Sequence, residues 1–196
     1  MIIDNLNVSR EVKEALLNYQ NLLLKWNKAI NLISRNSKKD IWARHILDSL
    51  QLLKYIDFLD NIIDIGSGGG FPGIVLSIGG VKNIALVESD KKKSVFLARA
   101  AKLSLNKIII IDKRVDEKFT MNCDILTSRG FSSINNILEV TTGIKIQKKM
   151  LLLKGKNYEK EITEAQKNWL FDINLHDSIT SREGKIVEIS NIKKLV

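Results

Sequence analysis

The sequence contains few residues that could form covalent cross-links or bind metals. Among 196 residues there are one cysteine and two histidines, so the chain cannot form an internal disulfide or supply the four Cys or His ligands of a typical structural zinc site. No stretch approaches the roughly 18 apolar residues of a membrane span, and the N-terminus lacks a secretory pattern. We therefore expect a cytoplasmic protein with no metal and no membrane association.

The overall composition is that of a globular domain with an excess of positive charge. Hydrophobic residues make up 44% and charged residues 27%, and the net charge of +9 favours a polyanionic partner such as nucleic acid. Lysine supplies most of this excess, a skew that genome base composition also produces. The charge alone therefore identifies no partner.

The apolar pattern divides the chain into two parts. From about residue 5 to residue 57 apolar residues recur at helical spacing, whereas after residue 58 short apolar runs alternate with helix-length segments. This alternation predicts a mostly parallel α/β sheet, so we expect a helical extension over 1–57, packed on an α/β core over 58–196 as one compact unit. The seven expected strands are 62–65, 84–87, 108–111, 124–126, 150–153, 171–175 and 186–189, and the last two should form an antiparallel hairpin.

A glycine-rich loop follows the first expected strand. The segment 64–73, DIGSGGGFPG, opens a helix, and its glycines allow tight turns and close approach to a ligand. It matches both the dinucleotide pattern G-x-G-x-x-G and the D-x-G-x-G-x-G loop of S-adenosylmethionine (SAM) methyltransferases. If Gly66, directly after the strand, is the first glycine, the dinucleotide pattern requires glycine where Phe71 stands. The register therefore favours SAM over a dinucleotide or a purely structural turn.

Acidic residues follow the second expected strand. Glu88 lies about 20 residues after Gly66, at a strand tip where a carboxylate can accept hydrogen bonds from both ribose hydroxyls of an adenosine. Either nucleotide cofactor would use it. Ser89 or Asp90 supplies an N-cap for the helix expected over 91–105, which leaves Glu88 free for a ligand.

Two further loops should border the same pocket, because ligands of open parallel sheets bind at the carboxyl ends of the strands. After the third strand, Val115 can present its backbone N–H to an adenine ring and Asp116 can bind the adenine amino group. After the fourth strand, Arg129 is placed to pair with a carboxylate or a phosphate. A surface charge is the alternative interpretation of Asp116.

The scarcity of cysteine and proline also restricts methyl-transfer chemistry. Methylation of cytosine C5 requires a cysteine nucleophile, typically after proline, whereas Cys123 follows Asn122 in an apolar strand and is expected in the core. Adenine amino-group methylation usually has an Asp/Asn-Pro-Pro-aromatic loop, and the only proline is Pro72. Guanine N7 needs neither, because it has a lone pair and no proton to remove.

A polar stretch precedes the glycine loop. Arg44 and Asp48 are four residues apart and can pair on a helix, while His45 and Ser49 lie on a neighbouring stripe. We interpret this helix face as a cap on the glycine loop. His45 alone cannot hold a metal, since His176 is distant in the sequence.

Together these motifs resemble those of the RsmG family, also called GidB, of bacterial small-subunit rRNA methyltransferases. The resemblance implies a cytoplasmic enzyme with a Rossmann-like class I methyltransferase fold. It also implies SAM-dependent methylation of N7 of the guanine at position 527 of 16S rRNA, with free rRNA or the 30S subunit as partner and a monomeric enzyme. The matching segments are 26–28 with 31–32, 44–49, 64–73, 92–93 with 96–97, 114–117, 128–129 and 153–155.

The resemblance also implies residue roles. The expected cofactor residues are Gly66 and Phe71 near the methionine part of SAM, Glu88, Ser89 and Asp90 near the ribose, Val115 and Asp116 near the adenine, and Arg129 near the transfer site. Gly68 and Gly70 of the glycine loop are also expected to bind the cofactor. From the residues themselves and not from the resemblance, the candidate substrate contacts are Arg44, His45, Phe131 and Lys154. Phe131 could stack on a base and Lys154 could contact a phosphate, and the alternatives are a core aromatic and a solvated lysine. The chain departs from the family at Gly130, where alanine is usual, and at 145–149, which lacks the usual Pro-Gly-Gly turn.

Two other functions stay open from the sequence. An NAD(P)-dependent oxidoreductase would use the same glycine loop and the same acid after the second strand. An RNA-binding module without catalysis would account for the positive charge.

Overall fold

The computed structural model describes residues 8–34 and 40–195. The helices are α1 (Arg10–Trp26), the π-helical turn η3 (Trp42–Leu47), α2 (Asp48–Leu50), the 3-10 helices η4 (Gln51–Tyr55) and η5 (Ala101–Leu103), α3 (Gly73–Ile78), α4 (Lys91–Ala100), α5 (Ile134–Val140) and α6 (Tyr158–Ala165). The strands are β1 (Asn61–Ile65), β2 (Asn83–Glu88), β3 (Ile108–Asp112), β4 (Met121–Arg129), β5 (Ile144–Lys154), β6 (Trp169–Asp177) and β7 (Lys185–Lys194). Within the described ranges, none of the helices is long and apolar enough to cross a bilayer.

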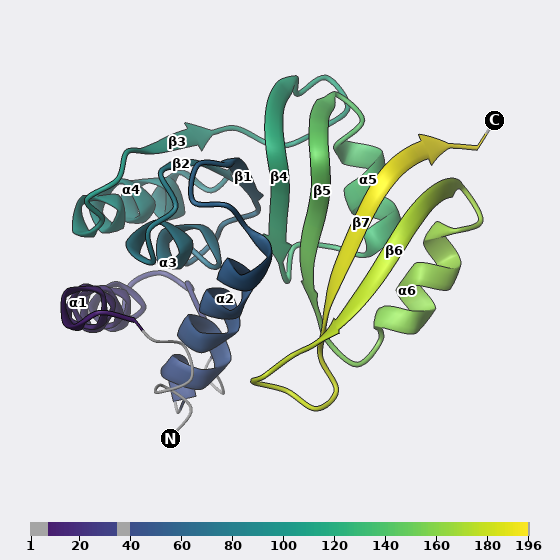
Figure 1. Cartoon of the computed structure of the whole chain (residues 1–196). Coiled ribbons are helices and arrows are strands. Elements are labelled where there is room, and N and C mark those ends of the chain that lie inside the picture. The colour runs from purple at the N-terminus through teal and green to yellow at the C-terminus, as the bar shows by residue number, and fades with distance from the viewer. Residues whose placement is uncertain (1–7, 35–39, 196) are drawn as a thin grey trace.

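The strands form one seven-stranded sheet in the order β3-β2-β1-β4-β5-β7-β6 (Figure 1). Strands β1 to β5 run parallel to one another, and β7 is inserted antiparallel between β5 and β6. The expected mostly parallel sheet with a terminal antiparallel hairpin is therefore confirmed. Because β1 to β5 point the same way, their carboxyl ends meet along one edge of the sheet, and in Figure 1 the ends of β4 and β5 point downwards.

Several elements differ in length from the prediction. Strand β5 begins six residues before the apolar run at 150–153, since the residues over 145–149 are mostly polar and partly exposed. The helix expected over 91–105 ends at Ala100 and tightens into the 3-10 helix η5. Apolar runs therefore mark the buried part of a strand and not its full length.

Residues that alternate along the strands pack on opposite faces of the sheet, as the pleat requires. Ile62 and Leu86 belong to a core formed with α1, α3 and α4, whereas Ile63 and Val87 belong to a second core formed with α5 and α6. Cys123, in β4, is buried in this second core, as expected. Helices therefore cover both faces, which leaves the ends of the strands for a ligand.

The N-terminal helices share the first of these cores. The side chains of Leu16, Tyr19 and Leu23 on α1 are completely buried against it, and Ser9 caps the start of the helix by accepting a hydrogen bond from the Val12 N–H. Figure 1 shows α1 and α2 below α3, with α2 beside the lower end of β4. The N-terminal part of the chain therefore lies beside the edge where ligands bind.

The predicted ion pair between Arg44 and Asp48 is wrong. The segment over Trp42–Leu47 is a π-helical turn, in which residue i bonds to i+5 and residues four apart no longer stack as on an α-helix. Asp48 pairs instead with Arg129 at the end of β4, with 3.3 Å between Oδ2 and Nη1. This ion pair joins the N-terminal helices to the sheet.

Candidate functional site

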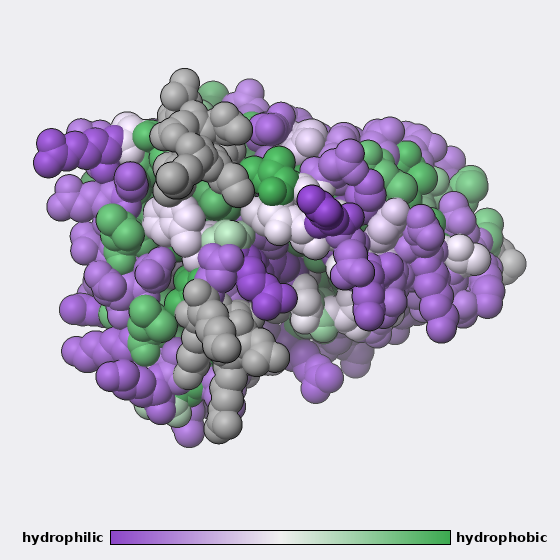
Figure 2. Space-filling model, turned by 90° about the horizontal axis from the view of Figure 1, so that it is seen from below, coloured by the Kyte–Doolittle hydropathy of each residue, from purple (hydrophilic) through white to green (hydrophobic). Residues whose placement is uncertain are grey.

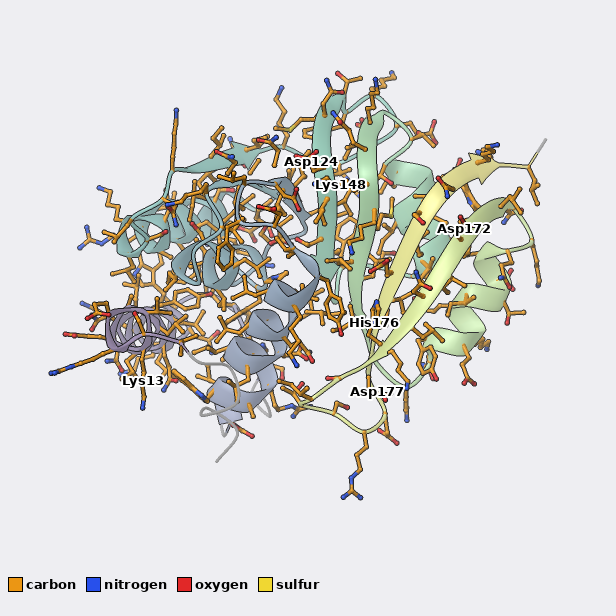
Figure 3. All side chains as sticks on the ribbon, in the orientation of Figure 1. Lys13, Asp124, Lys148, Asp172, His176 and Asp177 are labelled. Atoms are coloured by element: carbon orange, nitrogen blue, oxygen red, sulfur yellow. The ribbon has the colours of Figure 1, made fainter. Side chains whose placement is uncertain are left out.

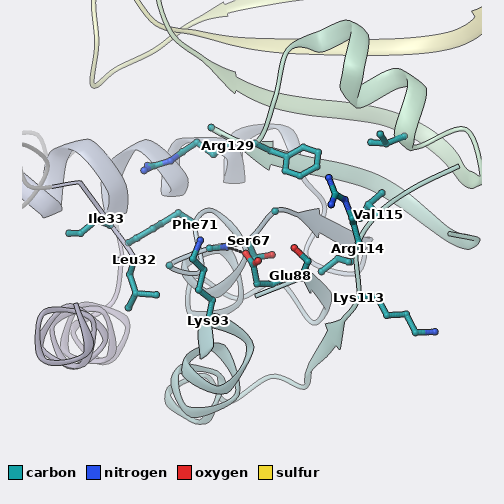
Figure 4. A pocket seen from close by; sticks show the side chains of 18 of the residues that line it. Leu32, Ile33, Ser67, Phe71, Glu88, Lys93, Lys113, Arg114, Val115 and Arg129 are labelled. Atoms are coloured by element: carbon teal, nitrogen blue, oxygen red, sulfur yellow. Dashed lines mark hydrogen bonds between the residues drawn. The ribbon is translucent and has the colours of Figure 1, made fainter. Parts of the chain in front are cut away.

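A cavity of about 580 Å³ lies at the carboxyl ends of β1 to β4 (Figure 4). Its volume is in the range of small-molecule sites. The lining residues are Leu32, Ile33, Gly66, Ser67, Gly68, Gly69, Phe71, Val87, Glu88, Ser89, Lys93, Lys113, Arg114, Val115, Arg129, Gly130, Phe131, Asn136 and Val140. Most of the residues predicted to bind a cofactor line this one cavity.

The glycine loop between β1 and α3 forms one wall. Gly66, Gly68 and Gly70 have φ angles of +64°, +53° and +90°, a region that favours glycine. The N–H groups of Gly66 and Ser67 both donate to the carbonyl of Val87, which fixes the loop to the end of β2. The loop conformation therefore requires the glycines that the sequence pattern singled out.

Asp64 lies beneath the loop and is not among the residues that line the cavity. Its buried carboxylate accepts hydrogen bonds from the Gly73 N–H at 3.3 Å and from the Thr127 hydroxyl at 3.1 Å. Burial raises the pKa of Asp64 to about 7, against the lowering effect of these hydrogen bonds. The Asp64 carboxylate on β1 thus links the first residue of α3 to β4 through hydrogen bonds.

Glu88 stands at the tip of β2, on the rim of the glycine loop. Its two carboxylate oxygens accept hydrogen bonds from the Gly68 N–H at 2.8 Å and the Asp90 N–H at 2.9 Å. The carboxylate is therefore held in place and faces the cavity, as Figure 4 shows. Asp90 instead caps α4, since its side chain accepts from the N–H groups of Lys92 and Lys93.

An aromatic cluster joins the N-terminal helices to the loop. Phe71 is buried, makes an edge contact with Tyr19 at 5.5 Å between ring centroids, and stacks on His45 at 4.8 Å. The Tyr19 hydroxyl donates to the Gly69 carbonyl. The interpretation of the 44–49 segment as a cap on the glycine loop agrees with these contacts.

Arg129 extends from β4 into this cluster, between the cavity and η3. Its guanidinium lies 5.1 Å from the centroid of the Phe71 ring and donates to the Arg44 carbonyl at 2.8 Å, to Asp48 and to His45 Nδ1. Burial lowers the pKa of Arg129, and Asp48 opposes that effect. Four neighbours therefore fix the orientation of the guanidinium.

His45 is neutral in this arrangement. Burial lowers its pKa to about 3, and the positive charges of Arg129 and Arg44 act in the same direction. A neutral ring can accept from Arg129 at Nδ1, which leaves the proton on Nε2. No group of three or more potential metal ligands occurs among the described residues.

The segment at Leu32 and Ile33 lines the cavity from the N-terminal side and was missed by sequence reasoning. The side-chain oxygen of Asn27 accepts hydrogen bonds from both N–H groups, at 2.8 and 3.0 Å, and holds the segment beside the glycine loop. The motif at 26–28 with 31–32 was the signal for this contact. This motif does not suggest a binding or catalytic role in the sequence, because Asn27 acts by positioning the backbone of Leu32 and Ile33.

The loop after β3 lines the opposite side. Val115 is buried against the cavity, while Arg114 and Lys113, which were not predicted, add two positive charges. Asp116 is exposed, and its carboxylate accepts from the Lys118 N–H. Asp116 is not among the lining residues, so its contact with adenine stays a prediction.

The remaining predicted residues lie at different depths. Gly70 is buried below the loop surface and, like Asp90, is outside the lining set, so their cofactor roles also stay predictions. Phe131 is 38% exposed and lies over Gly66, where an added Cβ atom would overlap the Phe131 ring. Arg44 and Lys154 line a second, adjoining cavity.

Comparison with known proteins gives one family. The family model described as rRNA small subunit methyltransferase G, or GidB, matches residues 12–190. A protein of Rickettsia akari named ribosomal RNA small subunit methyltransferase G is 53% identical over 97% of this chain and 100% of its own length. The protein of the same name from Rickettsia prowazekii is 52% identical with the same coverage.

Solved structures show the same fold at low identity. The magnesium protoporphyrin IX methyltransferase of Synechocystis, solved with bound SAM, superposes with a TM-score of 0.60 at 12% identity, over 88% of this chain and 97% of that one. A SAM-dependent methyltransferase of Methanococcus maripaludis gives 0.58 at 18% identity, over 97% and 98%. The expected Rossmann-like class I methyltransferase fold is therefore confirmed.

Proposed function

Because the chain belongs to the rRNA small subunit methyltransferase G family of SAM-dependent enzymes, we propose that it methylates N7 of the guanine at position 527 of 16S rRNA. The observation that carries the proposal is the cavity at the carboxyl ends of β1 to β4, with the glycine loop on one wall and Glu88 on its rim. We further propose that the enzyme acts as a cytoplasmic monomer on free 16S rRNA or the 30S subunit.

The residues of the cavity fit SAM. The positive φ angle of Gly68 and the open space above it, where an added Cβ atom would meet only the Gly66 carbonyl at 3.7 Å, allow a ligand to approach the backbone. The Glu88 carboxylate keeps free lone pairs for two ribose hydroxyls, although each oxygen already accepts one N–H. Val115 supplies an apolar wall for the adenine, and Ser89 also lines the cavity.

The chemistry makes few demands on the protein. SAM supplies a methyl group on a positively charged sulfur. The lone pair of guanine N7 forms the new bond to the methyl carbon while the carbon–sulfur bond breaks, so its electron pair returns to sulfur and neutralises it. The positive charge passes to the guanine ring, and no proton has to be removed.

The protein's own contribution is to align the two reactants and exclude water. Arg129 and Phe71 lie at the side of the cavity that faces η3, and their mutual contacts hold both rigid. We assign Arg129 to the vicinity of the transfer site. The ring of Phe131, above Gly66, covers the glycine loop on the cofactor side and is also within reach of an incoming base.

Transfer of a labelled methyl group tests the proposal. The substrates are 16S rRNA and 30S subunits from a strain that lacks this methylation, and we expect the label as 7-methylguanine at a single position. The proposal fails if neither substrate is labelled. Titration calorimetry with SAM and NADH separates the alternatives, since an oxidoreductase would bind NADH and not SAM, and a binding module would bind RNA without transfer.

A further inference from the structure

A second cavity of about 390 Å³ adjoins the first at Arg129 and Gly130, which line both. It lies between η3, the ends of β4 and β5, and the loop that joins β6 to β7. Its lining residues are Arg44, Asp48, Arg129, Gly130, Leu153, Lys154, Gly155, Ser178, Thr180, Ser181, Gly184 and Lys185. The two cavities are therefore neighbours, separated by Arg129 and Gly130.

The β6–β7 loop, residues 178–184, is fastened to the N-terminal helices. The Thr180 hydroxyl donates to the Asp48 carboxylate at 2.7 Å, and the Ile179 N–H donates to the Gln51 side chain at 2.9 Å. Asp48 also pairs with Arg129. A single carboxylate therefore joins the loop of the hairpin to the arginine at the cofactor cavity.

The second cavity attracts anions. Arg44, Arg129, Lys154 and Lys185 stand against one carboxylate, that of Asp48, among its lining residues. The Ser181 hydroxyl, which accepts from the Gly184 N–H, adds a hydrogen-bond donor, whereas the Thr180 hydroxyl already donates to Asp48. The lining is therefore suited to a phosphate group more than to a neutral base.

The four cations differ in how far they are already neutralised. Arg129 pairs with Asp48, Lys154 pairs with Glu161 at 2.8 Å, and Lys185 pairs with Asp177. The exposed Arg44 guanidinium has no ion pair with any of the residues in 8–34 and 40–195. Arg44 is thus the cation that is most available to a new anion.

The position of the cavity agrees with an RNA path. Figure 2 views the molecule from below Figure 1, towards the carboxyl ends of the parallel strands, and this face is largely hydrophilic. Figure 3 places Asp177 at this end, whereas Asp124 and Lys148 lie at the opposite end of the sheet. The second cavity, at the ends of β4 and β5, therefore lies at the same edge of the sheet as the cofactor cavity.

We propose that the second cavity binds a backbone phosphate of the rRNA strand next to the target guanine, with Arg44 as its principal cation and the β6–β7 loop as its outer wall. This inference rests on the proposed function, because it needs an RNA strand whose target base reaches the cofactor cavity. The lysine and arginine residues spread over the chain would attract RNA in general, whereas this cavity would bind one particular phosphate. The N-terminal helices and the β6–β7 loop both contribute to the cavity.

Binding of an rRNA fragment that contains the target guanine tests the inference. Arg44→Ala keeps the backbone carbonyl that accepts from Arg129, so the fold and the SAM affinity should persist. We expect its RNA affinity to fall about tenfold, as for a lost hydrogen bond to a charged group. We also expect the slope of log affinity against log salt to decrease by about 0.7 to 0.9, the value for one lost phosphate contact.

Three further variants complete the experiment. Ser181→Glu places a negative charge in the cavity and should weaken RNA binding, whereas Arg44→Lys should keep the salt slope. Arg99→Ala removes an exposed arginine of α4 that lines neither cavity, and it should behave as the wild type.

The outcomes separate the two proposals. Unchanged RNA affinity and salt slope in both Arg44→Ala and Ser181→Glu, in a wild-type protein that transfers methyl groups, would overturn the phosphate site alone. An equal loss in Arg99→Ala would also overturn it, since the effect would then follow total charge. A wild type that transfers no methyl group to rRNA would overturn the proposed function and this inference together.

Discussion

The ring of His45 stacks on the ring of Phe71, with 4.8 Å between centroids and an angle of 29° between the planes. His45 belongs to the π-helical turn η3, and Phe71 belongs to the glycine loop, so this contact links the N-terminal helices to the cofactor cavity. The same imidazole accepts from Arg129. The geometry of the cavity wall therefore depends on a histidine outside the α/β sheet.

His45→Phe should make folding less sensitive to acid. Because the pKa of His45 is lowered from 6.5 to about 3, the unfolded state binds a proton between these values that the folded state does not. The free energy of unfolding of the wild type therefore falls as the pH drops through this window. Urea unfolding at pH 7.5 and pH 5 measures the effect, and an equal pH dependence in the variant would contradict it.

Asp64→Asn should have the opposite signature. Burial raises the pKa of Asp64 from 3.8 to about 7, so the folded state keeps a proton between these values that the unfolded state releases. The wild-type free energy of unfolding therefore loses this contribution as the pH rises from about 4 to 7. In the same urea experiment, we expect the free energy of unfolding of Asp64→Asn to increase relative to that of the wild type as the pH rises from about 4 to 7. A constant difference would show that Asp64 titrates normally.

Gly66→Ala and Gly130→Ala form a matched pair, because their φ angles are +64° and +63°. Each variant should lose about 1–2 kcal/mol of stability from left-handed backbone strain. At Gly66 the new methyl group also meets the Phe131 ring, whereas at Gly130 nothing lies within 4 Å. Gly66→Ala should therefore lose more stability and more SAM affinity than Gly130→Ala, as measured by thermal unfolding and calorimetry. Equal losses would mean that Phe131 moves aside freely.

Asn27→Ala should weaken SAM binding from a distance. Its side-chain oxygen holds the N–H groups of Leu32 and Ile33 at the cavity, and leaving these groups without an acceptor costs about 1–3 kcal/mol. Asn31→Ala is the control, since Asn31 is exposed and nearby. Calorimetry with SAM should show a loss of affinity for Asn27→Ala only. If the two variants bind SAM equally, the 32–33 segment does not contribute to the site.

Arg129→Ala and Asp116→Ala should each lower SAM binding or methyl transfer without unfolding the protein. Arg129→Lys should not restore activity, because a lysine cannot reproduce the planar contacts to Asp48, His45 and Arg44. Circular dichroism checks the fold, and single-turnover transfer measures the reaction. Full activity in both alanine variants would remove Arg129 and Asp116 from the site.

The part of the site that could be predicted from the sequence is the part built by local rules. The glycine loop, Glu88 and Arg129 each directly follow or end a strand, and parallel strands bring such ends together. The approximate strand positions followed from their buried apolar runs. These features depend on short sequence patterns and on the rule that the carboxyl ends of parallel strands lie at one edge of the sheet.

The rest depends on contacts between distant segments. The partner of Asp48 was predicted at Arg44 and is Arg129, because a π-helical turn changes which residues share a helix face. Leu32 and Ile33 carry no polar chemistry, so their place at the cavity could only come from the hydrogen bonds to Asn27. Such positions follow from packing and not from residue type.

The insertion of β7 between β5 and β6 also sets an order of events during protein synthesis. The strands and loops of the cofactor cavity, β1 to β4, leave the ribosome well before residues 185–194. The β6–β7 loop, which contacts Asp48 through Thr180, is also made late, directly before β7. A nascent chain can therefore form the cofactor-binding half first, while the wall of the second cavity is completed near the end of translation.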